Sequence, residues 1–490
     1  MKKILSIILA ASVMLGISSC KGFLDTVPTD SVADVVAMTT IPDAQVAVNG
    51  LYTLIKSEEI YGSTMVYLGD MRGDNLYPTD ISGYGKTIYL YDYTETQSSY
   101  FSSLWGYFYK TIMRANALLA NIDKLEASPS EEAIKDDCKG QALAMRALCY
   151  FDLARVYGYP YLKDNGASLG AIVLTKPTSP EEARVPRNTV AETYAQALKD
   201  INDALPLLSK SRNTGHFNYW AARLLQAKIS LYKGDYQNAY SYAKEVIDSK
   251  VYSLTPNNKY KEYWAHEGQD ETVLEFLLAM KNNLDDDMGF GCVYNALWFG
   301  VSEAKGNVVP TKRWKELFKD TPNDIRFQML EYDDPSTGAK QTGKYWLKKF
   351  LGNQDRGMGF RLNNPHVLRL ADAYLIAAEA GVEIGAKDAS DYLNAIRKRA
   401  DPTAEDVTAT VALVQTERQK EFIGEGDRFF DVMRRGGKFV RDMVYDPDDF
   451  AGGAGYQTEI DWNYYKIVMP IASTERLIHK ELQQNPGYKD

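Results

Sequence analysis

The sequence is poor in the residues that most often build metal and disulfide sites. Among 490 residues there are four histidines and four cysteines, and they show neither the HExxH pattern nor a Cys/His cluster with zinc spacing. The chain also has no GxSxG, P-loop or dinucleotide-binding motif. The sequence therefore gives no sign of the commonest zinc, serine-hydrolase or nucleotide sites.

Long hydrophobic runs are missing too, with one short exception at the start of the chain. Two lysines precede an apolar run from Ile4 to Ile17, and small residues then lead to Cys20. The run has about 14 residues, whereas a helix needs about 20 to cross a bilayer core. We interpret residues 1–19 as a secretory signal peptide. Its end resembles a bacterial lipoprotein signal, in which the cysteine is acylated; an ordinary signal with Cys20 incidental is the alternative.

If Cys20 carries lipid, the other three cysteines are too few for a disulfide framework. Cys138 and Cys149 fall within one predicted helix, where eleven residues separate them by about 16 Å. A disulfide needs Cα atoms within about 7 Å. We therefore expect these two residues and Cys292 to be small buried hydrophobic side chains.

The chain has no excess of positive charge. It carries 65 acidic and 56 basic side chains, a net charge of −9, so we expect no nucleic-acid partner, because phosphate binding needs a basic surface. The acidic runs at 285–287 and 446–449 offer oxygen ligands for Ca²⁺, but neither has EF-hand spacing. We expect solvated loops there and no metal or cofactor.

Helical periodicity predicts a mostly α fold with interrupted tetratricopeptide-like repeats, a loop-rich insertion and a few short strands. One repeat unit pairs Trp220–Leu231 with Tyr236–Ile247, and a second runs from Leu370 to Ala400. The two units lie about 150 residues apart, so the repeats are not in tandem. We expect a helical scaffold at about 42–58, 104–254 and 366–436, and loop-rich ligand-binding regions at about 61–103, 255–365 and 437–476.

Several short motifs follow one another along the chain. They are Phe23-Leu24-Asp25 after Cys20, Arg114-Ala115-Asn116, Ala144 to Leu153, Leu393 to Ala400, Glu417 to Asp431 and Gln484 to Tyr488. In this order they resemble the SusD/RagB-type outer-membrane lipoproteins. The resemblance implies one SusD-like domain over residues 20–490. It also implies a surface-exposed protein, lipid-anchored to the outer membrane, that captures glycans for a SusC-like TonB-dependent transporter and is not an enzyme.

A glycine-punctuated loop after Gly69 is the predicted glycan site. A sugar presents apolar faces and polar rims, so its site needs aromatic platforms beside hydrogen-bonding groups. The loop supplies Asp70, Arg72, Asp74, Asn75, Tyr77 and Tyr84. The resemblance adds aromatic residues of the later insertion: Tyr294, Trp298 and Trp314. Each of these rings could instead fill the core.

The segment from Glu417 to Arg434 is predicted to be one charge-rich helix. Glu417 and Glu421 lie one turn apart, as do Asp427 and Asp431, so a carboxylate pair for glycoside hydrolysis is conceivable. We favour a structural role, in which carboxylate–arginine pairs stitch the helix. A third hypothesis is a helical-repeat adaptor that binds peptides. Glycan cleavage would support the hydrolase hypothesis. Peptide binding without glycan binding would support the adaptor hypothesis.

Overall fold

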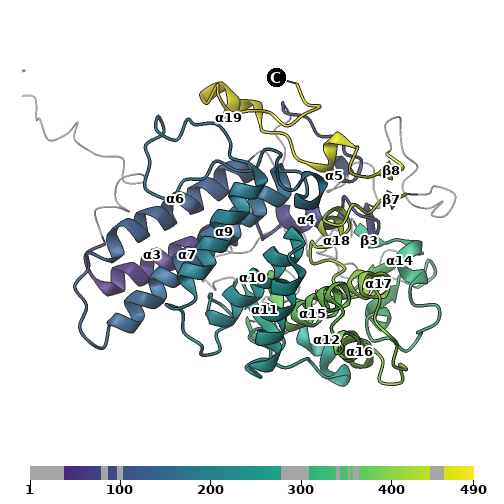
Figure 1. Ribbon diagram of the computed structural model, residues 1–490. Coiled ribbons are helices and arrows are strands. Elements are labelled where there is room, and N and C mark those ends of the chain that lie inside the picture. Colours follow the sequence, from purple (N-terminus) through teal and green to yellow (C-terminus); the bar gives the residue numbers. More distant parts are fainter. Residues whose placement is uncertain are drawn as a thin grey trace, which may run out of the picture.

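The computed structural model describes residues 38–78, 86–96, 103–277, 308–337, 343–350, 352, 354–356, 363–441 and 457–489. Helices dominate these residues and the strands are short, as predicted (Figure 1). The helices are α3 (Ile41–Ile55), α4 (Thr64–Asp70), α5 (Lys86–Tyr89), α6 (Leu104–Ile122), α7 (Glu132–Tyr157), α8 (Tyr161–Asp164), α9 (Val190–Ala204), α10 (Tyr219–Lys233), α11 (Tyr236–Asp248), α12 (Tyr260–Tyr263), α14 (Lys312–Glu316), α15 (Leu370–Ile384), α16 (Ala389–Ala400), α17 (Val411–Glu421), α18 (Arg428–Met433) and α19 (Ser473–Ile478). The strands are β1 (Leu76–Pro78), β2 (Thr272–Glu275), β3 (Val308–Pro310), β4 (Leu330–Tyr332), β5 (Tyr345–Leu347), β6 (His366–Arg369), β7 (Phe439–Val440) and β8 (Glu459–Ile460).

Helix α7 is the centre of the N-terminal half, where it packs against α3, α6 and α9 (Figure 1). Ala142, Ala144 and Ala147 of α7 are completely buried, and such small side chains let neighbouring helices approach closely. The free thiols of Cys138 and Cys149 are buried in the same helix, which confirms that they are not paired with each other. No helix in the described ranges is long and apolar enough to cross a membrane.

The two predicted repeat units are present, and they lie against each other. Gly234, at φ +77°, closes α10 before α11, and Gly385, at φ +71°, closes α15 before α16. Helix α11 packs on both α10 and α15, and its Ala239 and Ala243 are fully buried. The units that the insertion separates in the sequence are therefore neighbours in space.

The prediction of one helix from Glu417 to Arg434 is wrong. Helix α17 ends at Glu421 and α18 begins at Arg428. Between them Gly424 and Gly426 adopt φ values of +80° and +82°, a left-handed conformation that ends a helix and favours glycine. The break turns the intervening residues into a loop that packs against α4.

Short antiparallel strand pairs connect distant parts of the chain. β1 pairs with β3 and β2 with β6, while β4 pairs with β5 and β7 with β8. The β1–β3 pair ties the loop after α4 to residues 308–310. The β2–β6 pair joins residues 272–275 to residues 366–369, near the two ends of the insertion. These pairs place the predicted site loop beside the insertion.

Candidate functional site

The loop that follows α4 is buried and braced by the C-terminal half of the chain. Arg72, with no exposed surface, donates to the carbonyls of Leu68 at 2.8 Å and Ile467 at 3.0 Å, and its guanidinium lies 3.7 Å from the centroid of the Phe429 ring. Arg441 donates to the carbonyls of Met71 and Gly73. These contacts therefore hold this part of the loop in place.

The other predicted site residues that the structure describes are also buried or paired with side chains of the protein. Asp74 forms an ion pair with Arg428 at 2.7 Å. Asn75 accepts a hydrogen bond from Gln419 at 2.8 Å. The side chains of Asp70, Arg72, Asn75, Tyr77 and Trp314 are at most 6% exposed. In this structure, packing and polar partners within the protein occupy these side chains, and their assignment to the glycan site stays a prediction.

Trp314 shows why an aromatic residue in the insertion need not face a ligand. The N-cap of α14, Thr311, accepts a hydrogen bond from the Trp314 backbone N–H. The indole then lies fully buried, and its Nε1–H donates to the carbonyl of Gln419 at 3.0 Å. Tyr84, Tyr294, Trp298 and the proposed acylation site, Cys20, lie outside the described residues, so these assignments stay predictions.

Asp70 is a buried carboxyl at the contact between α4 and the α17–α18 loop. Its Oδ2 accepts the Gly426 N–H at 2.9 Å, whereas Oδ1 is buried without a hydrogen-bond partner. Burial raises the pKa of Asp70 to about 8. The folded chain therefore holds this carboxyl protonated at neutral pH.

Asp70→Asn is expected to raise the melting temperature more at pH 8 than at pH 5. The folded pKa of about 8 lies above the ordinary value of 3.8, so the folded chain binds a proton that the unfolded chain releases. The stability that this group contributes is complete below the ordinary pKa and is lost as the pH rises through the folded pKa. Asparagine keeps an acceptor for Gly426 and does not titrate. Thermal unfolding at both pH values tests this; a stability difference that is independent of pH contradicts it.

One pair of exposed aromatic residues lies in the insertion. Tyr332 of β4 and Tyr345 of β5 are directly opposite in the strand register, with ring centroids 4.9 Å apart and planes tilted by 45°. They are 47% and 39% exposed, and among the described residues they are the only aromatic members of the exposed large hydrophobic side chains. The pair is a two-ring surface open to solvent.

The exposed pair adjoins the predicted site loop. Strand β5 lies beside β3, and Lys344 donates to the hydroxyl of Tyr77 in β1 at 3.2 Å. Trp346, the next residue along β5, is 2% exposed, as expected for alternating side chains in a strand. Our sequence reasoning missed both tyrosines, because only the β4–β5 pairing, which the sequence does not reveal, brings them together.

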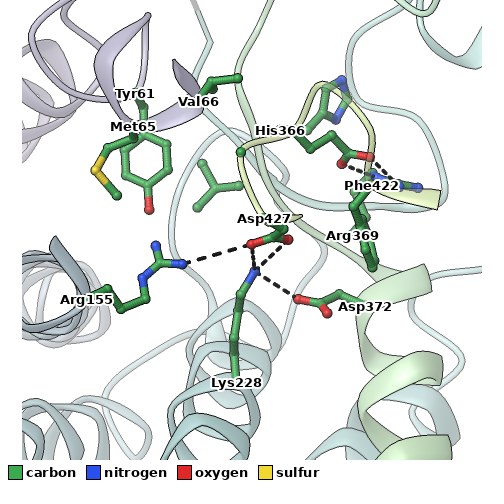
Figure 2. Close-up of a pocket in the computed structure, with 13 residues that line it drawn as sticks. Tyr61, Met65, Val66, Arg155, Lys228, His366, Arg369, Asp372, Phe422 and Asp427 are labelled. Carbon is green, nitrogen blue, oxygen red and sulfur yellow. Dashed lines mark hydrogen bonds and ion pairs between the residues drawn. The ribbon is translucent and has the colours of Figure 1, made fainter. Parts of the chain in front are cut away.

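A small charged cavity lies where α7, α10 and α15 meet the α17–α18 loop (Figure 2). Lys228 Nζ lies 2.9 Å from Asp427 Oδ1 and 3.2 Å from Asp372 Oδ2, and Arg155 Nη1 lies 4.0 Å from Asp427. Burial alone would lower the pKa of Lys228, but the two carboxylates outweigh burial and raise it. Lys228 is therefore charged.

The volume of this cavity, about 30 Å³, decides what it can hold. Ligand pockets usually have at least about 300 Å³, whereas a water molecule needs only about 10 to 15 Å³. Burial lowers the pKa of His366, another lining residue, to about 3, so it is neutral. The cavity suits one or two water molecules within an ionic network and has no room for a sugar.

The carboxylates of the 417–431 segment are paired with cations from other elements. Glu421 lies 3.0 Å from both Arg326 and Arg369 and 2.7 Å from Arg399. Asp431 lies 2.7 Å from Arg418. The structural interpretation of these carboxylates holds, but most of the partners come from distant parts of the chain rather than from neighbouring helix positions.

A larger groove lies between the start of α6, residues 172–184 and the C-terminal segment that contains α19. Its volume is about 270 Å³. Trp105 and Tyr109 of α6 line it together with Glu475 and Ile478 of α19. Figure 1 shows the C-terminal segment with α19 along one edge of the molecule.

As for metals, no group of His, Cys, Asp or Glu that could hold an ion occurs in the part of the chain described.

Two family models match this chain and together span most of it. One, described as the SusD family, matches residues 233–488. The other, described as starch-binding associating with outer membrane, matches residues 22–231. The boundary between the two matches falls in the last turn of α10.

Individual proteins agree with these models. A SusD-like protein of Formosa agariphila is 25% identical over 91% of this chain and 92% of its own length. The starch-binding protein SusD of Bacteroides thetaiotaomicron is 34% identical over 123 residues, which are 25% of this chain and 21% of its own. The solved structure of a SusD superfamily protein from Bacteroides vulgatus superposes with a TM-score of 0.83 at 34% identity, and the match covers 92% of this chain and 100% of that one.

Proposed function

The chain belongs to the SusD family of carbohydrate-binding proteins associated with the outer membrane, and from this premise we propose that it captures glycans at the cell surface. It holds a glycan without cleaving it and passes it to a SusC-like TonB-dependent transporter. The transporter partner is inferred from the family. A binding role without catalysis is supported by the names of the relatives and by the pairing of the 417–431 carboxylates with buried cations.

The observation that carries the proposed binding role is the exposed pair of Tyr332 and Tyr345. Tyrosine offers an apolar ring, a polar hydroxyl and few torsions to restrict on binding. Two such rings, held 4.9 Å apart across a strand pair, match the apolar face of a sugar ring and its polar rim. The predicted contacts of Tyr84, Tyr294 and Trp298 belong to the same proposal.

Replacing both tyrosines with alanine is expected to weaken glycan affinity by at least about tenfold, because each aromatic contact contributes about 1 kcal/mol. The melting temperature should change little, since both side chains are exposed. Tyr107→Ala, at a partly exposed tyrosine on α6, is the matched control and should leave affinity unchanged. Calorimetric titration measures the affinities. Unchanged glycan affinity in the double variant would remove the tyrosine pair from the site.

Cys20→Ala is expected to release the protein from membranes without altering its fold. In the proposal an acyl chain on this residue anchors the protein to a bilayer, and alanine removes the thiol that would carry it. Fractionation of cells that express each form, with circular dichroism of the released protein, measures both effects. Retention of the variant in the membrane fraction would refute the proposed anchor.

A further inference from the structure

We infer that the groove between α6 and α19 is a second carbohydrate-binding subsite, which takes one pyranose ring of a glycan. This inference rests on the proposed function but concerns a different surface from the Tyr332–Tyr345 pair. The groove volume of about 270 Å³ is close to the lower end, about 300 Å³, of small-molecule pockets. The charged cavity, by contrast, has a volume of only about 30 Å³.

The aromatic side of the groove is rigid before any ligand arrives. The rings of Trp105 and Tyr109 lie 4.9 Å apart with planes tilted by 48°. The Tyr109 hydroxyl is fixed twice by Ile172, because it accepts from the backbone N–H at 2.6 Å and donates to the carbonyl at 3.0 Å. A ring held in this way loses little conformational entropy on binding. Tyr109, which is partly exposed, is the ring that suits the C–H face of a sugar, whereas Trp105 is only 4% exposed and packs against it.

The polar lining of the groove includes the carboxylate of Glu475, together with Thr178, Arg184 and His479. Among the described residues the Glu475 side chain makes no hydrogen bond and no ion pair, although it is partly buried. Burial raises the pKa of Glu475, which agrees with a carboxyl that has no partner among the described residues. An acceptor of this kind can receive two hydrogen bonds from neighbouring sugar hydroxyls.

Gly106 keeps the groove open. It lies in the first turn of α6, and a Cβ built on it would have only Glu475 Oε1 within 4 Å, at 3.6 Å. A longer side chain at this position would extend into the groove without a backbone clash. An apolar side chain of a protein partner would also fit the volume, but the unpaired carboxylate of Glu475 favours a ligand that carries hydroxyl groups.

Gly106→Met is the test of this subsite, in a mature chain that also carries Tyr332→Ala and Tyr345→Ala. Maltotriose, laminaritriose and cellotriose are the probes, followed by saturation-transfer NMR and calorimetry. In the double tyrosine variant we expect residual binding of at least one probe. Gly106→Met should weaken that residual binding by at least about tenfold, and Glu475→Gln by several-fold. Gly106→Ala is the matched control and should preserve it, and the melting temperature should not fall in either glycine variant, because glycine disfavours a helix.

The outcomes separate this inference from the proposed function. If the unmodified chain binds a probe and the double tyrosine variant binds none, the subsite is refuted and the proposed function stands. Residual binding that Gly106→Met leaves unchanged also refutes the subsite. If the unmodified chain binds no probe, the subsite is refuted, and the broader glycan panel described below decides the proposed function separately.

Discussion

Gly69→Ala is expected to destabilise the protein by more than about 4 kcal/mol, enough to prevent folding of many domains. A Cβ at this position would lie 1.7 Å from the carbonyl oxygen of Gly426 and 2.1 Å from its carbonyl carbon. Both contacts are with backbone, so no side-chain rotation relieves them. Gly426 cannot easily move away from position 69, because its N–H donates a hydrogen bond to Asp70 and the backbone of Val66 lies close beside it.

Gly50→Ala is the matched control for this prediction. Gly50 lies within α3, and a Cβ there would meet only Arg114 Nη1, at 3.9 Å. Alanine should therefore stabilise the protein by about 0.5 to 1 kcal/mol, because glycine in a helix interior costs conformational entropy. Urea unfolding of both variants gives the two free energies. A Gly69→Ala protein with the unmodified midpoint would show that α4 and the α17–α18 loop do not touch as described.

Glu421→Ala is expected to lower the free energy of unfolding by about 3 to 5 kcal/mol, because it leaves buried cations without their partner. The carboxylate is fully buried and lies within 3.0 Å of Arg326, Arg369 and Arg399. Although burial opposes ionisation, these guanidinium groups hold the pKa of Glu421 well below its usual range. The network joins α17 to β6 and α16, so its loss affects the whole C-terminal half.

Asp203→Ala provides the exposed counterpart. Asp203 forms an ion pair with Lys199 on α9, and the two side chains are 47% and 64% exposed. Such surface pairs contribute at most about 1 kcal/mol and are screened by salt. Chemical unfolding at low and high salt compares the variants. If Glu421→Ala cost no more than Asp203→Ala, the buried network would not stabilise the fold as proposed.

Local signals made the helices predictable from the sequence. Thr40 and Asp43 form a capping box at the start of α3, and Thr189 and Glu192 form another at α9. Apolar spacing then marks the buried faces of these helices. A glycine turn at Gly234 closes the first helix of the clearest repeat unit, so its boundaries could be predicted within a few residues.

The site was less predictable, because long-range contacts decide which side chains are exposed. Asp70 looks like a loop residue in the sequence, but its partner Gly426 lies 356 positions away. Arg72 is enclosed by Phe429 and the carbonyl of Ile467 in the same way. Composition alone could not distinguish the buried Trp314 from the exposed Tyr345. The N-cap of α14 positions Trp314, and the β4–β5 pairing positions Tyr345.

The most direct test of the central claim is calorimetric titration of the mature chain, without residues 1–20, against a broad panel of plant, host and microbial glycans. Chromatography of the same samples shows whether each glycan stays intact. The account predicts saturable binding of at least one glycan, which is recovered uncleaved. Cleaved glycan would contradict a binding role without catalysis, and the absence of binding across the panel would contradict glycan capture itself.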